Sequence, residues 1–135
     1  MVSNMNSDVI EQLDKCIRWL DENNKANNLL EISTVIDRIA VLSVNVGHLV
    51  SDAYALMNEF EDTFKVAYAK SVSESDASVA KAEKAAEVAT AEAKRDWTAA
   101  KNAYKRLSVY LDRIDRVIES YRQFISVSKL DMKNG

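Results

Sequence analysis

The residues best suited to chemistry in this 135-residue chain are cationic side chains near its C-terminal end. On a helix they would fall within about 140° of arc and extend over about 33 Å. We call this set the basic strip, and its members are Lys94, Arg95, Lys101, Lys105, Arg106, Arg113 and Arg116. Phosphate backbones and acidic protein surfaces both suit such a strip, although the solvated face of an ordinary helix has a similar composition. Asp112 interrupts the strip, and no helix-turn-helix or zinc-finger spacing accompanies it.

Carboxylates form the second group of candidates, and they lie in the more acidic part of the chain. Residues 1–93 carry 8 basic and 16 acidic residues, against 10 and 5 in residues 94–135. An enzyme acting on nucleotides would have to use two clusters, namely Glu59, Glu61 and Asp62, and Glu83, Glu87 and Glu92. We find no pair of facing Glu-x-x-Glu and Glu-x-x-Asp motifs, which all-α nucleotide pyrophosphohydrolases need. We therefore expect a solvated acidic face and no enzymatic activity.

The single histidine and the single cysteine offer little further chemistry. His48 points away from the neighbouring apolar stripe and lacks the spacing of a bundle metal site, which favours a surface or subunit-contact histidine over a ligand or base. Cys16 lies on an apolar helix stripe, which indicates a buried small side chain rather than a nucleophile. One cysteine excludes an internal disulfide and any multi-cysteine zinc site. We expect no metal and no cofactor.

Long helices are the elements that must position these residues. The chain has no proline and two glycines, which excludes Gly-rich phosphate loops and argues against a turn-rich β fold. Apolar residues recur at helical spacing except at an Asn-rich stretch over 23–28 and a polar stretch over 73–76, where Ser75 or Asp76 can cap the next helix. The pattern predicts a single elongated all-α domain over residues 1–135, with helices over about 8–22, 31–72 and 77–128.

The two longer stripes complement each other when the chain is folded back near Ser75. Residue numbers in contact then sum to about 150, so that Ile36 meets Ile114, Val46 meets Tyr104 and Ala53 meets Trp97. Phe60 and Phe64 meet alanines, and 11 of the 27 residues from 77 to 103 are alanine. Because large side chains face small ones, we predict a long, coiled-coil-like antiparallel helical hairpin.

The first helix is expected to pack at the open end of this hairpin. Val41 and Val44 lie outside the hairpin stripe, so the second helix needs a third neighbour there. The rest of the hairpin is a two-helix arm with little core, and we expect it to pack against a second copy or another protein. Gly47 would allow close approach of the first helix or a partner, or a kink. The residues predicted for self-association are Gly47, Leu56, Phe60, Phe64 and Tyr68.

Two stretches of helical pattern look similar to a known group of proteins. They are Glu31–Leu42 with the following Leu49–Met57, and Trp97–Lys101 through Arg122–Val127. They resemble small helical proteins encoded by tailed phages of Gram-positive bacteria, in early regions near recombination genes. The resemblance covers most of the chain and implies a role in phage recombination or replication. It carries over no activity and no functional residues.

The leading hypothesis is a non-enzymatic protein that oligomerises and binds DNA or a DNA-processing protein. An anti-defence inhibitor of a host nuclease or CRISPR complex is the alternative, and a nucleotide hydrolase is third. The first eight residues have neither the basic region nor the apolar core of a signal peptide. The longest apolar stretch, Ile39–Val50, is too short and too polar for a transmembrane helix. We therefore expect a cytoplasmic protein that does not engage membranes, and the resemblance to phage proteins implies the cytoplasm of a bacterial host.

Overall fold

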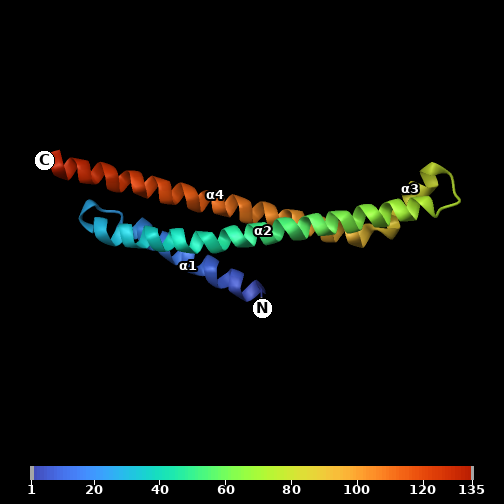
Figure 1. Ribbon diagram of the computed structural model, residues 1–135, viewed down its shortest axis with the longest axis horizontal. Helices are drawn as coiled ribbons and strands as arrows, with labels where there is room; N and C mark the ends of the chain where they lie inside the picture. Colours follow the sequence, from blue (N-terminus) through green and yellow to red (C-terminus); the bar gives the residue numbers. More distant parts are fainter. Residues whose placement is uncertain (1, 135) are drawn as a thin grey trace. The chain divides into compact units, whose positions relative to one another are not determined.

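The computed structural model describes residues 2–134, with side chains from residue 7 onward. Every element in this range is helical: α1 (Val2–Asn23), the 3-10 turn η1 (Ala26–Asn28), α2 (Leu29–Ser73), α3 (Val79–Ala89) and α4 (Ala91–Asn134), as Figure 1 shows. α2 and α4 are antiparallel and contact each other, which confirms the prediction of an all-α helical hairpin. None of the helices described is both long and apolar enough to cross a membrane.

The chain divides into two compact units. Unit 1 comprises Met1–Leu49 and Leu107–Gly135, and unit 2 comprises Val50–Arg106. α2 and α4 each continue from one unit into the other, so this division does not test the prediction of a single domain. Each unit has its own packing and is described by itself.

Unit 1 contains the aliphatic core. Its three helical segments bury long aliphatic side chains completely, which helical spacing places along one face of each segment. Full burial of each such side chain contributes about 1.5–3 kcal/mol. The largest fully buried side chains described are Leu13 and Leu20 of α1, Ile32, Ile36, Ile39 and Val46 of α2, and Ile114 of α4.

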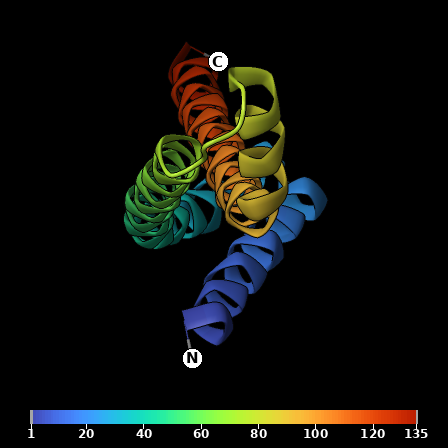
Figure 2. The same ribbon diagram turned by 90° about the vertical axis from the view of Figure 1, so that its right-hand side faces the viewer.

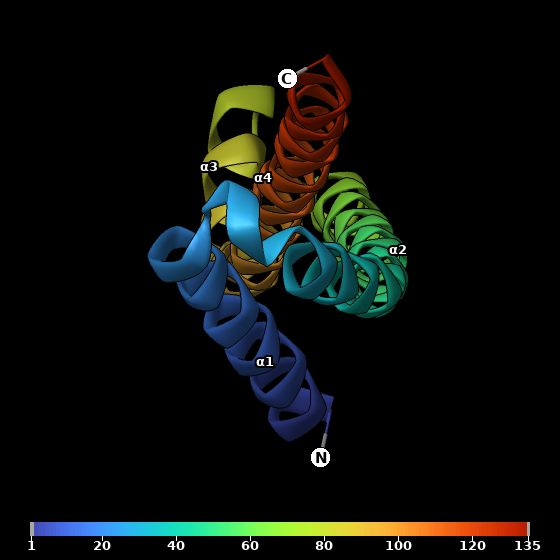
Figure 3. The same cartoon turned by 90° about the vertical axis from the view of Figure 1, so that its left-hand side faces the viewer.

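α1 packs in unit 1 as predicted, but it is longer and covers less of α2 than predicted. It begins at Val2 rather than near residue 8, because no proline or glycine stops the helix from continuing through residues 2–8. The Tyr110 hydroxyl donates a 2.9 Å hydrogen bond to Asp14 Oδ1 and joins α1 to α4. α1 leaves Val41 and Val44 uncovered, with exposures of 69% and 58%, so the prediction that it covers them is wrong. Figure 3 shows the crossing of α1 and α2.

The Asn-rich break between α1 and α2 is confirmed. α1 ends at Asn23, whose side-chain amide donates to the carbonyl of Trp19 at 2.8 Å. The amide of Asn28 donates to the carbonyl of Asn23 at 3.3 Å, across the η1 turn. These bonds satisfy carbonyls that the end of a helix leaves free, and α2 then starts at Leu29.

The predicted helix over 77–128 is wrong in one respect, because it is two helices in the structure. α3 ends at Ala89 and α4 begins at Ala91, out of line with each other in unit 2 (Figure 2). Thr90 lies between them and is only 4% exposed. Its hydroxyl donates to the Ala86 carbonyl at 2.7 Å and so competes with the backbone hydrogen bonds of the helix. Side-chain bonds of this kind bend helices.

The ends of that predicted helix also differ. The residue preceding α3 is Ser78 rather than Ser75 or Asp76, and it makes no side-chain capping bond. Ser75 Oγ instead accepts a bond from the Ala77 N–H at 3.3 Å within the connecting loop. At the other end α4 continues to Asn134, six residues beyond the predicted end, because no helix-breaking residue precedes Gly135.

The pairing register within unit 2 differs from the prediction. Tyr104 lies against Tyr54, with ring centroids 5.3 Å apart, rather than against Val46. Trp97 stacks on Phe64 at 5.4 Å and 26° rather than meeting Ala53. The partners on α2 are therefore shifted by eight and eleven residues. Aromatic rings gain from stacking beyond their burial, so large residues face large ones here, contrary to the large-on-small pairing that we predicted.

Candidate functional site

The basic strip is exposed along its whole length. Five of its members lie in unit 2, and Arg113 and Arg116 are exposed in unit 1. Between residues 94 and 106 there are five basic residues and one acidic residue, a balance of +4 over three and a half turns of α4. The acidic residue, Asp96, lies about 100° around the helix from Trp97, on the side away from the strip. The positive charge of this stretch of α4 is therefore concentrated on one face of the helix.

A groove in unit 2 coincides with this face. Its volume is about 820 Å³, and α2 contributes aromatic side chains while α4 contributes cationic, hydroxyl and small ones. The residues that line it are Phe64, Tyr68, Glu87, Thr90, Ala91, Lys94, Arg95, Thr98, Ala99 and Asn102. The structure thus brings together two members of the basic strip and two residues predicted for self-association.

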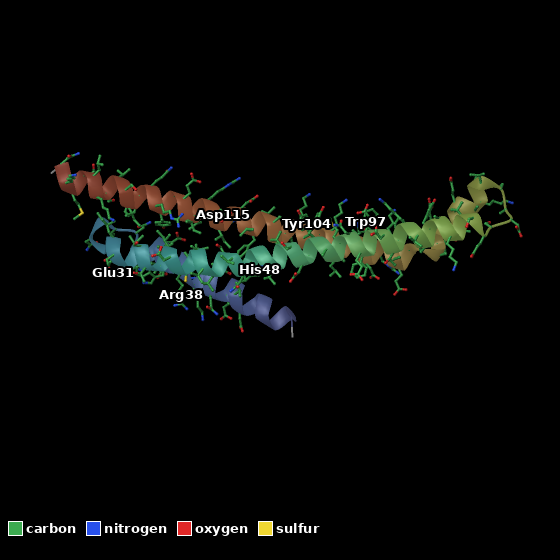
Figure 4. All side chains as sticks on the ribbon, viewed as in Figure 1. Glu31, Arg38, His48, Trp97, Tyr104 and Asp115 are labelled. Atoms are coloured by element: carbon green, nitrogen blue, oxygen red, sulfur yellow. The ribbon has the colours of Figure 1, made fainter. Side chains whose placement is uncertain are left out.

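Aromatic packing holds the wall of the groove in place. Phe64 contacts both Trp97 and Tyr68, whose ring centroid lies 5.9 Å from its own. Lys101 Nζ lies 5.9 Å from the centroid of the Trp97 ring, within reach of a cation–π interaction. Trp97 and Tyr104 follow one another along the same side of α4 in Figure 4. The sequence singled out Phe64 and Tyr68 but did not place them beside Lys94 and Arg95, because the predicted register of α2 against α4 was wrong.

The bend at Thr90 places the first turn of α4 at the groove. Thr90 and Ala91 line it, so the N-terminal turn of α4 opens beside Lys94 and Arg95. Free N–H groups and the positive end of the helix dipole favour anions at this point. Glu87 in the lining and Glu92 in the first turn partly offset this potential. Sequence reasoning missed Thr90, whose only signal was a β-branched residue in an alanine-rich helix.

The remaining residues predicted for self-association are not gathered in one place. Phe60 is half-buried and Leu56 is exposed, both in unit 2. Gly47 lies in unit 1, where a side-chain Cβ would meet no atom within 4 Å, so the predicted close approach of the first helix at Gly47 is wrong. α2 continues through Gly47 without interruption. A contact of these residues with a second copy stays a prediction.

The acidic clusters lie on solvated surfaces. Glu83, Glu87 and Glu92 are exposed, as are Glu59 and Asp62. Glu61 forms a 2.6 Å ion pair with Lys65, and this hydrogen bond raises the pKa of the lysine. Among the residues described, no three His, Cys, Asp or Glu side chains are grouped so that they could hold a metal ion.

His48 is exposed on α2, as the wheel predicted (Figure 4). Cys16 is half-buried rather than fully buried, because it lies at the edge of the α1–α2 contact. It borders a small groove in unit 1 of about 360 Å³, together with Gln12, Lys15, Trp19, Val35 and Arg38.

Unit 2 therefore presents a mixed aromatic and cationic groove on the face of α4 that carries most of the basic strip. Its chemistry suits binding of an anion that also offers flat or apolar groups. Comparisons of this chain with protein-family models, with curated proteins and with solved structures find no match.

Proposed function

We propose that this protein is a non-enzymatic binding protein that takes DNA on the α4 face of unit 2. The observation that carries the proposal is the coincidence of the groove with Lys94 and Arg95 of the basic strip. Lys101, Lys105 and Arg106 continue the charge along the same helix. DNA combines the two features that this face can recognise, because it has a regular phosphate backbone and flat bases.

The dimensions support one stretch of phosphate backbone. Residues 94 to 106 extend over about 18 Å of helix. Successive phosphates of one DNA strand advance by about 3.4 Å along the duplex axis, so this length of helix corresponds to an advance of about five phosphates. If all five cations form contacts with duplex DNA, the logarithm of the association constant falls against the logarithm of salt concentration with a slope of about −4.5.

Fluorescence anisotropy with labelled duplex and single-stranded DNA tests the proposal. The variant Lys101→Glu/Lys105→Glu/Arg106→Glu is expected to lose at least tenfold in affinity, with a shallower salt dependence. The matched control is Lys70→Glu/Lys81→Glu/Lys84→Glu, which reverses three exposed lysines of the same unit. At about 0.15 M salt the Debye length is about 8 Å, so the control is expected to change affinity less than threefold. Equal losses in both variants, or no affinity of the wild-type protein at low salt, would contradict the proposal.

An acidic protein surface is the second candidate, as an anti-defence inhibitor of a host nuclease or CRISPR complex would require. The aromatic wall of Phe64 and Tyr68 favours it, because such side chains are enriched at protein interfaces. It predicts no affinity for free DNA. It also predicts capture of one host protein that Tyr68→Ala and the triple Glu variant both abolish.

The resemblance to phage early-region proteins gives either candidate a setting in the host cytoplasm, in recombination, replication or defence. The nucleotide hydrolase is the least supported alternative. Mg²⁺-dependent turnover on a nucleotide panel, abolished by Glu83→Gln or Glu87→Gln, would replace the binding proposal.

A further inference from the structure

Unit 1 has a second groove, formed by α2 and α4. Its volume is about 810 Å³. α2 contributes only the small residues Ala40 and Ser43, and Ile118 of α4, with 7% exposure, lies beneath. The other lining residues all come from α4: Asp115, Glu119, Arg122, Gln123, Ser126 and Val127.

α1 occupies a different side of the α2–α4 pair in this unit. It contacts α2 beside Val35 and Arg38, and its Asp14 bonds Tyr110 of α4. On helical wheels, Val35 and Arg38 lie about 80° to 160° from Ala40 and Ser43. The three helical segments of unit 1 thus leave one α2–α4 groove without a covering helix, and small residues on one wall allow a helix to approach closely.

The order of charges along this groove is self-complementary. Asp115 and Glu119 precede Arg122 on the same side of α4, and none of the three forms an ion pair within the described chain. Consider a second copy whose α4 lies antiparallel to the first and is related to it by a two-fold axis. Arg122 of each copy then faces Asp115 and Glu119 of the other copy. The axis then lies near residues 119–120.

Two exposed apolar side chains lie on the same side of α4 as this groove. Val127 lines the groove, Leu130 lies about 20° from Glu119 on the helical wheel, and both are more than half exposed. Antiparallel pairing about residues 119–120 places residues 109–112 of the second α4 over them. An isologous interface uses one patch on both subunits, so both copies would bury Val127 and Leu130.

We infer that this groove is the site where a second copy of the chain docks, through antiparallel contact of the two α4 helices in unit 1. Arg122 of each copy pairs with Asp115 and Glu119 of the other, while each copy covers Val127 and Leu130 of the other. This dimer contact is separate from the basic groove of unit 2. It differs from the predicted self-association through Leu56, Phe60, Phe64 and Tyr68.

Sedimentation velocity over a concentration series tests this pairing through charge exchange. Arg122→Glu alone, and Asp115→Lys/Glu119→Lys alone, each set like charges against one another and are expected to raise the dimer dissociation constant at least tenfold. Mixing the two variant chains restores both sets of ion pairs, so a heterodimer of wild-type affinity is expected. Arg113→Glu is the matched control, because it reverses an exposed arginine of α4 that does not line the groove.

Circular dichroism verifies that each variant keeps its helical content. A monomeric wild-type protein at all concentrations would overturn the inference, as would a mixture that stays monomeric. If the dimer persists in the Arg122→Glu variant but is lost in Phe64→Asp, self-association takes place in unit 2 and the inference is overturned. DNA affinity is measured on the same samples, so a failure here is distinct from a failure of the proposed function.

Discussion

The two units are built from the same kind of element but bury very different side chains. Unit 1 has three helical segments, and it contains all the largest fully buried side chains described. Unit 2 buries Ala82, Ala86, Thr90 and Ala100, while its aromatic residues remain partly exposed. Unit 2 also has three helical segments, from α2, α3 and α4, but the side chains that it buries are small, so it buries less apolar surface. Stability is therefore expected to concentrate in unit 1, and surface for binding in unit 2.

The largest effect should come from opening a cavity in unit 1. Ile36→Ala removes a nearly fully buried side chain from the aliphatic core. Loss of such a side chain costs about 2–5 kcal/mol in unfolding free energy, because the surrounding helices cannot collapse fully. Urea unfolding followed by circular dichroism measures the change.

The counterpart in unit 2 is Trp97→Ala, which removes a larger side chain. Trp97 is only partly buried, so its loss should destabilise the protein less than Ile36→Ala, although a buried tryptophan would cost about 3–5 kcal/mol. If Trp97→Ala proves the more damaging of the two, the contrast between the units is wrong.

A smaller effect is expected at the hydrogen bond that joins α1 to α4 in unit 1. Tyr110→Phe removes the bond to Asp14 and should cost about 1 kcal/mol at pH 7. Burial, followed by the bond to Asp14, raises the pKa of Tyr110 above its ordinary value. The folded state therefore holds this proton more tightly than the unfolded state, so its stabilising contribution is present below about pH 10 and falls as the pH rises further.

Urea unfolding of the wild-type and Phe variants between pH 7 and about pH 11 measures this contribution. The difference between the two proteins should shrink above about pH 10. A difference that is constant over this range would show that Tyr110 does not titrate differently in the folded protein.

The smallest effect is an increase in stability. Gly47→Ala fills open space on a continuous helix and should stabilise the protein by about 0.5–1 kcal/mol, since glycine loses more backbone entropy on folding. Thermal unfolding measures the gain. A loss of stability, or a change in sedimentation, would indicate a close neighbour at Gly47 and would support its predicted role in self-association.

The sequence was sufficient to predict which face of each long helix is buried. Ile36 and Val46 were both predicted to face the other long helix and are both buried, because aliphatic residues at steps of three and four leave little choice of face. The register was not predictable in this way. Shifts of eight and eleven residues are about two and three helical turns and return the same face inward, so periodicity alone is compatible with several pairings.

The groove of unit 2 escaped prediction for the same reason. Its lining depends on Phe64 and Tyr68 lying beside residues 90–102, and the predicted register placed Phe64 against Ala86 instead. The bend at Thr90 depends on one side-chain hydrogen bond to a carbonyl, which helix propensity does not reveal. Exposure of the basic strip was predictable, since it required only the helical phase of α4.

The two tryptophans are divided between the units, with Trp19 in unit 1 and Trp97 in unit 2. Single-tryptophan proteins made by Trp97→Phe or Trp19→Phe therefore provide an intrinsic fluorophore specific to each unit. Coincident fluorescence transitions in the two proteins would mean that the units unfold as one cooperative block. Separated transitions would mean that unit 2 melts while unit 1 is still folded. The emission of Trp97 would then report both ligand binding to unit 2 and its local melting in one experiment.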